Sequence, residues 1–384
     1  MTPAVLPPLS LYIHIPWCVR KCPYCDFNSH ARQDALPEQD YIQALSQDLS
    51  AERERLQSLR PLHSIFIGGG TPSLFSAEAI GQILTDVDRQ WGIGTDTEVT
   101  LEANPGTFEQ QRFEGFRQAG INRLSLGIQS FNDTHLQALG RIHNADNALT
   151  AARSARRIFD KLNLDLMHGL PGQLTVEALA DLQQAIDLSP DHLSWYQLTL
   201  EPNTEFHARP PTLPVDEALW DIQEQGQELL DQAGFRQYEI SAYAKDNRVS
   251  QHNLNYWQFG DYLGIGAGAH GKTSRQSSDN NALLFERHHK LRQPKAYLAS
   301  LHKTAGREHI PTDELSFEFM LNALRLSDGV ASELFSARTG LPLTSITAQL
   351  TKAREWGLLE NDTRVLRPTR QGRLFLNDLL GLFL

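Results

Sequence analysis

All three cysteines of the 384-residue chain lie close together near its start, at Cys18, Cys22 and Cys25. They occupy a C-x3-C-x2-C loop that follows the apolar, strand-like segment at residues 11–15. Pro16 should end that strand, because proline has no N–H to give to a sheet. Three thiols at this spacing can hold a metal site, form a redox pair or form a disulfide, so the chemistry of the chain is expected here.

A disulfide framework, a redox pair and a structural zinc ion remain open as alternatives to the favoured interpretation given below. A disulfide framework is disfavoured, because the cysteine count is odd and a chain of this length can build its own core. Cys22 and Cys25 match the C-x-x-C of a thiol–disulfide oxidoreductase, but that motif should open a helix and would leave Cys18 without a role. A structural zinc ion would need a fourth ligand, such as His14 or His30.

The favoured interpretation is an iron–sulfur cluster held by three thiolates. Thiolate sulfur is the soft ligand that such clusters use. Three cysteines on a cube of four irons leave one iron without a protein ligand, and that iron could bind a substrate or cofactor. The spacing alone indicates only the three-thiolate site.

The elements that would position this loop alternate between strand and helix. Strands are expected at residues 63–67, 98–102, 123–127, 163–167, 192–200 and 238–242, and helices at 37–58, 76–91, 109–118, 132–140, 144–158, 176–188 and 216–233. This alternation predicts an α/β fold with a parallel sheet wrapped by helices, in the form of a partial, TIM-like barrel. Functional loops in such folds follow the carboxyl ends of the strands. The cysteine loop, residues 68–71, Glu102, Gln129 and Asp165 all stand at such ends, which predicts one shared site.

The rest of the chain divides into two further parts. We expect the barrel at residues 1–245, a connecting segment at 246–308 and a C-terminal domain at 309–384. The connecting segment carries a His-Asn-Leu-Asn-Tyr-Trp motif at 252–257 and a polar, loop-like stretch at 275–281. In the C-terminal domain, helices at 316–326, 331–339 and 343–356 and a hairpin at 362–371 resemble a winged helix.

Composition excludes several classes of partner. The net charge of −11 and the pI of about 5.7 argue against nucleic-acid binding and broad attraction to anionic membranes, which both need basic surfaces. No signal peptide and no apolar run long enough to span a membrane are visible. Unpaired thiols then predict a reducing, cytoplasmic location, with a peripheral membrane contact left open.

Several motifs in order carry a family resemblance. They are the cysteine loop with Tyr-Ile-His-Ile-Pro before it, Gly-Gly-Gly-Thr-Pro, Glu-Ala-Asn-Pro, Ser-Leu-Gly-Ile-Gln-Ser-Phe, Asp-Leu-Met-His-Gly-Leu-Pro-Gly and His-Asn-x-x-Tyr-Trp. Together they resemble the oxygen-independent coproporphyrinogen dehydrogenase group of the radical S-adenosylmethionine (SAM) superfamily. The dehydrogenases have a further cysteine two positions after the loop, where this chain has Phe27. Phe27 and the short stretch before the loop are similar to the heme-chaperone branch of the group.

The resemblance implies cofactors and partners. It implies a 4Fe–4S cluster whose open iron binds SAM, heme as a bound ligand, and delivery of heme to respiratory proteins. It also implies a homodimer that depends on the cluster and SAM. In the superfamily an electron from the cluster cleaves SAM to a 5′-deoxyadenosyl radical; whether this chain is an enzyme that cleaves SAM, and whether it binds one SAM or two, stays open. The alternative function is oxidative decarboxylation of coproporphyrinogen III.

The resemblance also implies roles for individual residues. Cys18, Cys22 and Cys25 match the cluster ligands. Polar and glycine positions match SAM contacts: Tyr12, Tyr24, Gly69, Gly70, Thr71, Glu102, Gln129, Arg141 and Asp165. His252 is the candidate heme ligand, since imidazole is a common axial ligand and Tyr256 and Trp257 could pack on the porphyrin. The alternative for His252 is a buried histidine that caps a turn, and His270 is a second candidate ligand.

Overall fold

The computed structural model describes residues 5–384 except 33, 57–59, 107–111 and 278–281. Its main feature is one twelve-stranded sheet in the order β14-β13-β12-β11-β1-β4-β5-β6-β7-β8-β10-β9. The strands of this sheet are β1 (Leu9–Ile15), β4 (Leu62–Gly69), β5 (Glu98–Ala103), β6 (Arg123–Gln129), β7 (Lys161–His168), β8 (His192–Gln197), β9 (Arg236–Gln237), β10 (Ala242–Ala244), β11 (Asp261–Ile265), β12 (His270–Gln276), β13 (Leu283–Lys290) and β14 (Thr304–His309).

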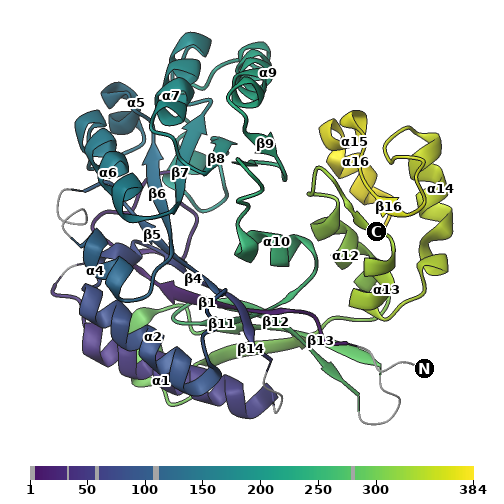
Figure 1. The fold of residues 1–384 in the computed structure, drawn as a ribbon, viewed down its shortest axis with the longest axis horizontal. Helices are drawn as coiled ribbons and strands as arrows, with labels where there is room; N and C mark the ends of the chain where they lie inside the picture. Colours follow the sequence, from purple (N-terminus) through teal and green to yellow (C-terminus); the bar gives the residue numbers. More distant parts are fainter. Residues whose placement is uncertain (1–4, 33, 57–59, 107–111, 278–281) are drawn as a thin grey trace.

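The predicted partial barrel of parallel strands is confirmed. Strands β1, β4, β5, β6, β7 and β8 are parallel neighbours, and helices follow them along the chain on the outside of the curved sheet (Figure 1). These helices are α1 (Glu38–Leu56), η1 (Pro72–Leu74), α2 (Ala77–Trp91), α4 (Phe113–Gln118), α5 (Asp133–Ala138), α6 (Ala145–Ile158), α7 (Thr175–Asp187), α8 (Glu205–Ala208) and α9 (Asp216–Gln232). The start of the helix expected at 109–118 lies outside the described residues.

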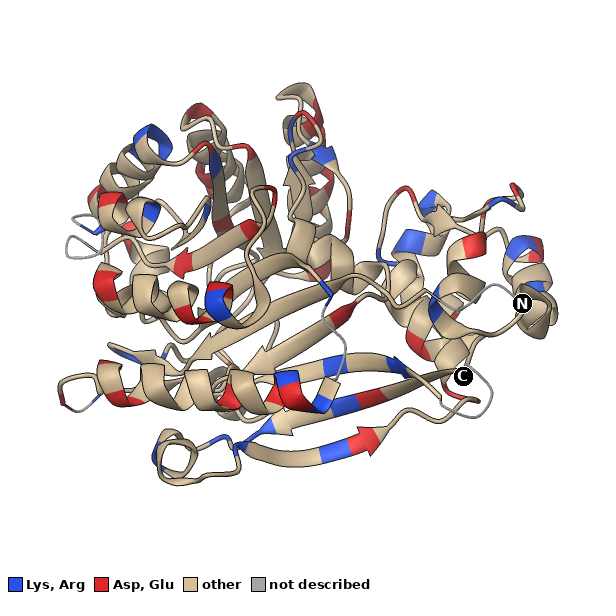
Figure 2. Ribbon diagram, turned by 60° about the horizontal axis from the view of Figure 1, so that its bottom comes forward, with Lys and Arg blue, Asp and Glu red and all other residues tan. Residues whose placement is uncertain are grey.

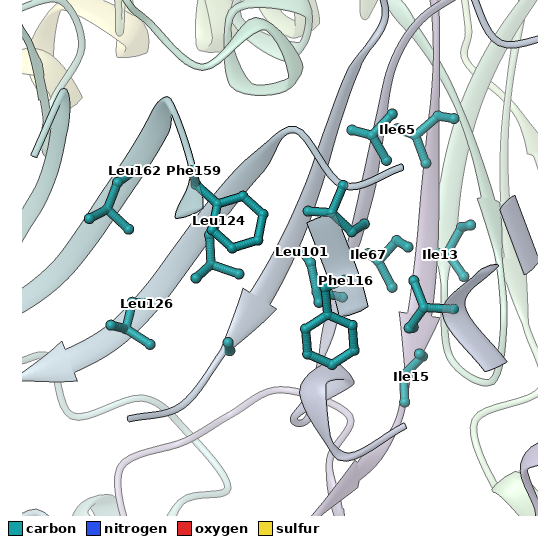
Figure 3. Close-up of a cluster of buried hydrophobic side chains, with 14 of the residues drawn as sticks. Ile13, Ile15, Ile65, Ile67, Leu101, Phe116, Leu124, Leu126, Phe159 and Leu162 are labelled. Carbon is teal, nitrogen blue, oxygen red and sulfur yellow. The ribbon is translucent and has the colours of Figure 1, made fainter. Parts of the chain in front are cut away.

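The strands form where the chain has short apolar runs that can be buried on both faces. Ile13, Ile65 and Leu101 are fully buried in neighbouring strands, and Leu124 continues the row. Figure 3 shows these side chains along the sheet, with Phe116 packed against them from the helical layer. Charged residues of both signs lie on the surrounding helices and on strands β12, β13 and β14 (Figure 2). The described residues include no helix that is long and apolar enough to cross a membrane.

The prediction of a parallel strand at residues 238–242 is wrong. Residues 238–241 form the turn between β9 and β10, and β10 pairs antiparallel with β8. The backbone N–H of Tyr238 donates to the carbonyl of Ala242, which closes this turn. The barrel therefore ends in an antiparallel hairpin and not in a further parallel strand.

Residues 246–308 also differ from the expected connecting segment. They contain α10 (Gln251–Trp257), α11 (Pro294–Ala299) and strands β11–β14. Strand β11 pairs parallel with β1, and β12, β13 and β14 follow in antiparallel order. The segment thus extends the main sheet beside the strand that leads into the cysteine loop, and part of the stretch expected as a loop at 275–281 belongs to β12. The domain boundaries themselves stay a prediction.

The C-terminal part is a small helical unit (Figure 1), and its hydrophobic core continues into residues of β10 and β13, such as Ala242 and Phe285. Its elements are α12 (Leu315–Ala323), β15 (Val330–Ala331), α13 (Glu333–Thr339), η2 (Leu343–Ile346), α14 (Thr347–Glu355), β16 (Val365–Leu366), α15 (Arg370–Leu374) and α16 (Leu376–Gly381). The three expected helices are present. The expected hairpin at 362–371 is different, because β16 pairs with β15 and residues 370–374 are helical.

Candidate functional site

The cysteine loop begins where β1 ends and is closed by a two-stranded pairing of β2 (Trp17–Cys18) with β3 (His30–Ala31). The side chain of Asn28 donates hydrogen bonds of 2.9 Å to the carbonyl oxygens of both Ala267 and Arg292, far along the chain. The three cysteines are free thiols. The loop is therefore a fixed part of the fold, held by residues from β1 and from the end of the sheet.

The glycine turn at the end of β4 packs directly against this loop. The N–H of Gly70 donates to the carbonyl of Ile15 at 2.8 Å. A Cβ atom at Gly70 would lie 2.5 Å from the carbonyl oxygen of Trp17 and 3.0 Å from Sγ of Cys18. Gly69 has a φ of 119° and donates its N–H to Glu102 at 3.1 Å. Glycine is required at both positions, because a side chain would displace the cysteine loop or strain the backbone.

A cavity of about 460 Å³ lies at the carboxyl ends of the parallel strands. All of the sequence-predicted site residues except Tyr12 and His252 line it: Cys18, Cys22, Tyr24, Cys25, Gly69, Gly70, Thr71, Glu102, Gln129, Arg141 and Asp165. These residues come from β4, β5, β6 and β7 or the turns that follow them, from the segment between α5 and α6, and from the cysteine loop. The structure therefore brings these predicted positions together at one edge of the parallel sheet.

Two carboxylic acids share the floor of this cavity. Burial, and then the nearby charge of Asp165, raise the pKa of Glu102 to about 8, and the N–H of Gly69 acts in the opposite direction. Burial also raises the pKa of Asp165, against hydrogen bonds from Ser125 at 2.9 Å and Asn163 at 2.7 Å. A pair of acids held in this way favours a cationic ligand, whose charge would allow both to ionise.

Arg141 connects the cysteine loop to the glycine turn. Its guanidinium donates to Asn104 at 2.6 Å and to the carbonyl of Gly127 at 2.7 Å, and it lies 3.8 Å from Sγ of Cys22. Asn104 in turn donates to the hydroxyl of Thr71 at 2.9 Å. A guanidinium at this position could also bind the carboxylate of a ligand.

Sequence reasoning missed other polar residues of the site. Asn104, Ser125 and Tyr196 also line the cavity, and the hydroxyl of Tyr196 donates to Gln129 at 2.9 Å. Gln129 itself has a left-handed φ of 69°, a strained conformation for a residue that is not glycine. Asn104 and Tyr196 stand at or just after strand ends, so the strand-end rule that indicated Glu102 could also have indicated them.

The donor set distinguishes among the chemistries proposed for the three thiols. No three His, Cys, Asp or Glu side chains in the described ranges converge on a single ion. Both ring nitrogens of His14 are engaged, with the hydroxyl of Tyr12 at 2.9 Å and the carbonyl of Asn28 at 3.0 Å, so His14 does not complete a zinc site. Residues 22–25 form a turn that no helix follows, unlike a redox C-x-x-C.

An iron–sulfur cluster fits this donor set better. A cubane binds each thiolate at a different iron, so its ligands surround a cavity and do not meet at one point. Burial raises the pKa of the Cys18 and Cys25 thiols, so their thiolate forms need a nearby positive charge, which iron would supply. The cavity thus accommodates three thiolates on one side and a polar ligand on the other.

His252, the candidate heme ligand, is buried and lies outside the thiol cavity. The ring is 1% exposed and lines neither this cavity nor its neighbour. Its Nδ1 is 2.9 Å from the hydroxyl of Ser64, and its Nε2 is 2.9 Å from the hydroxyl of Tyr256. Both nitrogens are occupied, so the alternative interpretation as a buried structural histidine describes this geometry. Tyr12 lines a second, adjacent cavity and not the one that holds the thiols.

Comparisons with known proteins agree with this arrangement. Residues 12–184 match the family described as the radical SAM superfamily, and residues 310–375 match the HemN C-terminal domain. The heme chaperone HemW of Haemophilus influenzae is 53% identical over 383 residues, which cover 99% of this chain and 98% of that protein. The heme chaperone HemW of Escherichia coli is 51% identical and covers 99% of each.

A solved structure shows the same fold. The coproporphyrinogen III oxidase HemN of Escherichia coli, a radical SAM enzyme, superposes with a TM-score of 0.81 at 22% identity and covers 98% of this chain and 90% of its own. At that sequence identity the similarity establishes the architecture, including the C-terminal unit, but it does not establish the activity.

Proposed function

The chain belongs to the HemW family of heme chaperones within the radical SAM superfamily, and from this we propose that it binds heme and passes it to acceptor proteins. The observation that carries the proposal is the full-length similarity to the HemW relatives. The cavity supports it, because it gathers the residues that a cluster and SAM would need.

We assign Cys18, Cys22 and Cys25 as the ligands of a 4Fe–4S cluster. When bound, such a cluster supplies an electron to the sulfonium of SAM. Glu102 and Asp165 would face the amino group of SAM, since they are the two acids that line the cavity on its sheet side and no salt bridge among the described residues involves them. Arg141 would orient the carboxylate, and the glycine turn gives the ligand close access to the backbone.

Phe27 separates this function from porphyrinogen decarboxylation. Its side chain is 58% exposed and lines both the thiol cavity and the adjacent cavity. The chain therefore presents an apolar ring at the position where the dehydrogenases carry a fourth thiol. We propose that the protein carries heme without decarboxylating coproporphyrinogen III.

Anaerobic reconstitution followed by two parallel assays tests the proposal. We expect a broad iron–sulfur absorption band in the wild type that Cys18→Ala, Cys22→Ala and Cys25→Ala each remove. We also expect saturable heme binding, transfer of heme to an apo-cytochrome, and no consumption of coproporphyrinogen III. Decarboxylation at an enzymatic rate, of about 1 per second or faster, would instead support the dehydrogenase function.

The finer features of the function are also proposals. We propose that the acceptors are respiratory heme proteins, and that the cluster and SAM promote a homodimer. A reducing cytoplasm would keep the cysteine loop available for cluster binding. Size-exclusion chromatography of the reconstituted protein with and without SAM tests the dimer, which should appear only in the loaded sample.

A further inference from the structure

A second cavity lies beside the thiol cavity and is the larger of the two. It has a volume of about 1030 Å³, at the upper end of the roughly 300–1,000 Å³ of ordinary ligand pockets. Its walls come from β1, α10, β11, β12, β13 and α12. Figure 1 shows these elements at the end of the sheet and in the adjoining C-terminal unit. Glu102, Gly69, Asp26 and Phe27 line both cavities. A ligand here would lie next to the cluster and SAM.

Strands β12 and β13 present a row of nitrogen-bearing side chains to this cavity. His270 is opposite His289 in the antiparallel register, and Lys272 is opposite Arg287. The two imidazole rings are stacked, with centroids 5.6 Å apart. Gly306, the next residue across the sheet, leaves room for His289, because a Cβ there would lie 2.4 Å from its ring. The sheet therefore fixes a histidine pair at the cavity wall.

These two histidines differ from His252 in what their nitrogens contact. His270 and His289 are both exposed to the cavity side, and in the described part of the chain no hydrogen bond occupies their ring nitrogens. Burial lowers the pKa of His270, and His289, Arg292 and Arg287 lower it further. A neutral imidazole with a free nitrogen is the form that binds iron.

The other walls suit a flat aromatic ligand with carboxylate groups. Tyr256 and Trp257 from α10 and Tyr262 from β11 line the cavity, and the rings of Tyr256 and Tyr262 meet edge to face at 4.5 Å between centroids. Arg287, which also pairs with Glu318, and the exposed Arg292 stand on the sheet side. Aromatic walls bind a porphyrin face, and guanidinium groups bind carboxylates.

We propose that this second cavity is the heme site, with the axial imidazole supplied by the His270–His289 pair and the propionates bound by Arg287 and Arg292. The inference rests on the proposed function, because it locates the heme that a chaperone would carry. It replaces His252, whose nitrogens are occupied by Ser64 and Tyr256. Heme would then lie on the far side of Phe27 from the thiol cavity.

Hemin titration of the full-length protein, followed by absorption spectroscopy, tests the site. We expect the double variant His270→Ala/His289→Ala to lose the imidazole-ligated spectrum and to bind heme about tenfold or more weakly. Added imidazole should restore the spectrum, which a merely structural defect would not allow. Matched controls are His302→Ala, which changes an exposed histidine outside the cavity, and His252→Ala. Both variants should keep the imidazole-ligated spectrum. Circular dichroism is used to establish that each variant is folded.

The outcomes separate the inference from the proposed function. A wild-type protein that binds no heme contradicts the chaperone function itself. A wild type that binds heme while the double variant keeps its affinity and spectrum overturns the location. Arg287→Ala/Arg292→Ala should weaken hemin more than a heme dimethyl ester, and equal weakening of both would remove the propionate assignment.

Discussion

Glu102→Gln should stabilise the ligand-free protein while weakening SAM binding. The pKa of Glu102 is about 8 in the fold, against 4.5 for an ordinary glutamate, because of burial and then the charge of Asp165. At pH 7 the unfolded chain releases this proton and the folded chain keeps it, which costs up to about 3 kcal/mol of unfolding free energy. The carboxyl is only half-buried between two cavities, so solvent screening should reduce this cost to about 1–2 kcal/mol.

The sign of the pH dependence follows from the raised pKa. The wild type is expected to lose stability as the pH rises from about 4.5 to about 8, since ionisation is favoured only in the unfolded chain. Glutamine does not titrate, so the stability advantage of the variant should be absent near pH 4.5 and largest above pH 8. Urea unfolding of the cluster-free protein across this range, followed by circular dichroism, measures the difference.

Glu54→Gln is the matched control, because Glu54 is exposed on α1. It should show no comparable gain at pH 8. In the reconstituted protein, Glu102→Gln should weaken SAM by about tenfold or more, through loss of a charge-assisted hydrogen bond. A variant that is no more stable than wild type at pH 8 would refute the burial argument, and unchanged SAM affinity would refute the contact.

Two further predictions concern the tight packing at Gly70 and the buried ion pairs of Lys290. Gly70→Ala should abolish cluster retention, because its Cβ would lie 2.5 Å from the carbonyl oxygen of Trp17. Gly81→Ala on α2 is the control and should retain iron, because its Cβ would make only an ordinary contact at 3.7 Å. Equal iron contents in the two variants after reconstitution would contradict this prediction. Lys290→Ala should cost about 3–5 kcal/mol of unfolding free energy, because the buried carboxylate of Asp48, 2.5 Å away, loses its cation. Glu52, at 2.7 Å, would keep only its pairs with Arg55 and Arg307. The exposed Lys295→Ala should cost less than about 0.5 kcal/mol in the same urea experiment, and a similar small loss for both would contradict the argument.

The barrel could be predicted from the sequence because its strands are buried on both faces. Runs such as the one around Ile65 and Ile67 are continuous and apolar, and helices separate them at regular intervals. Strands β12 and β13 gave no such signal, since residues such as Lys272 and Arg287 make them polar. Their place in the sheet depends on β11 pairing with β1, a contact between distant segments that local patterns do not contain.

The residues of the site also divide into those that local sequence patterns identify and those that depend on distant contacts. The cysteine loop, the glycine turn and Glu102 could be predicted, because spacing and strand ends identify them. The surroundings of His252 could not, because one of its hydrogen bonds is with Ser64, which is 188 positions away in the chain. A histidine beside Tyr256 and Trp257 looks like a ligand until both of its nitrogens are found to be occupied.

The attachment of Asn28 to Ala267 and Arg292 has a consequence for biosynthesis. These acceptors emerge from the ribosome more than 200 residues after the cysteines, and at about 5–20 residues per second that delay is on the order of tens of seconds. During this interval the cysteine loop lacks the two hydrogen bonds that attach it to the far end of the sheet. Iron and sulfide should therefore be loaded after release of the polypeptide, and a truncated product that ends before residue 292 should emerge without them.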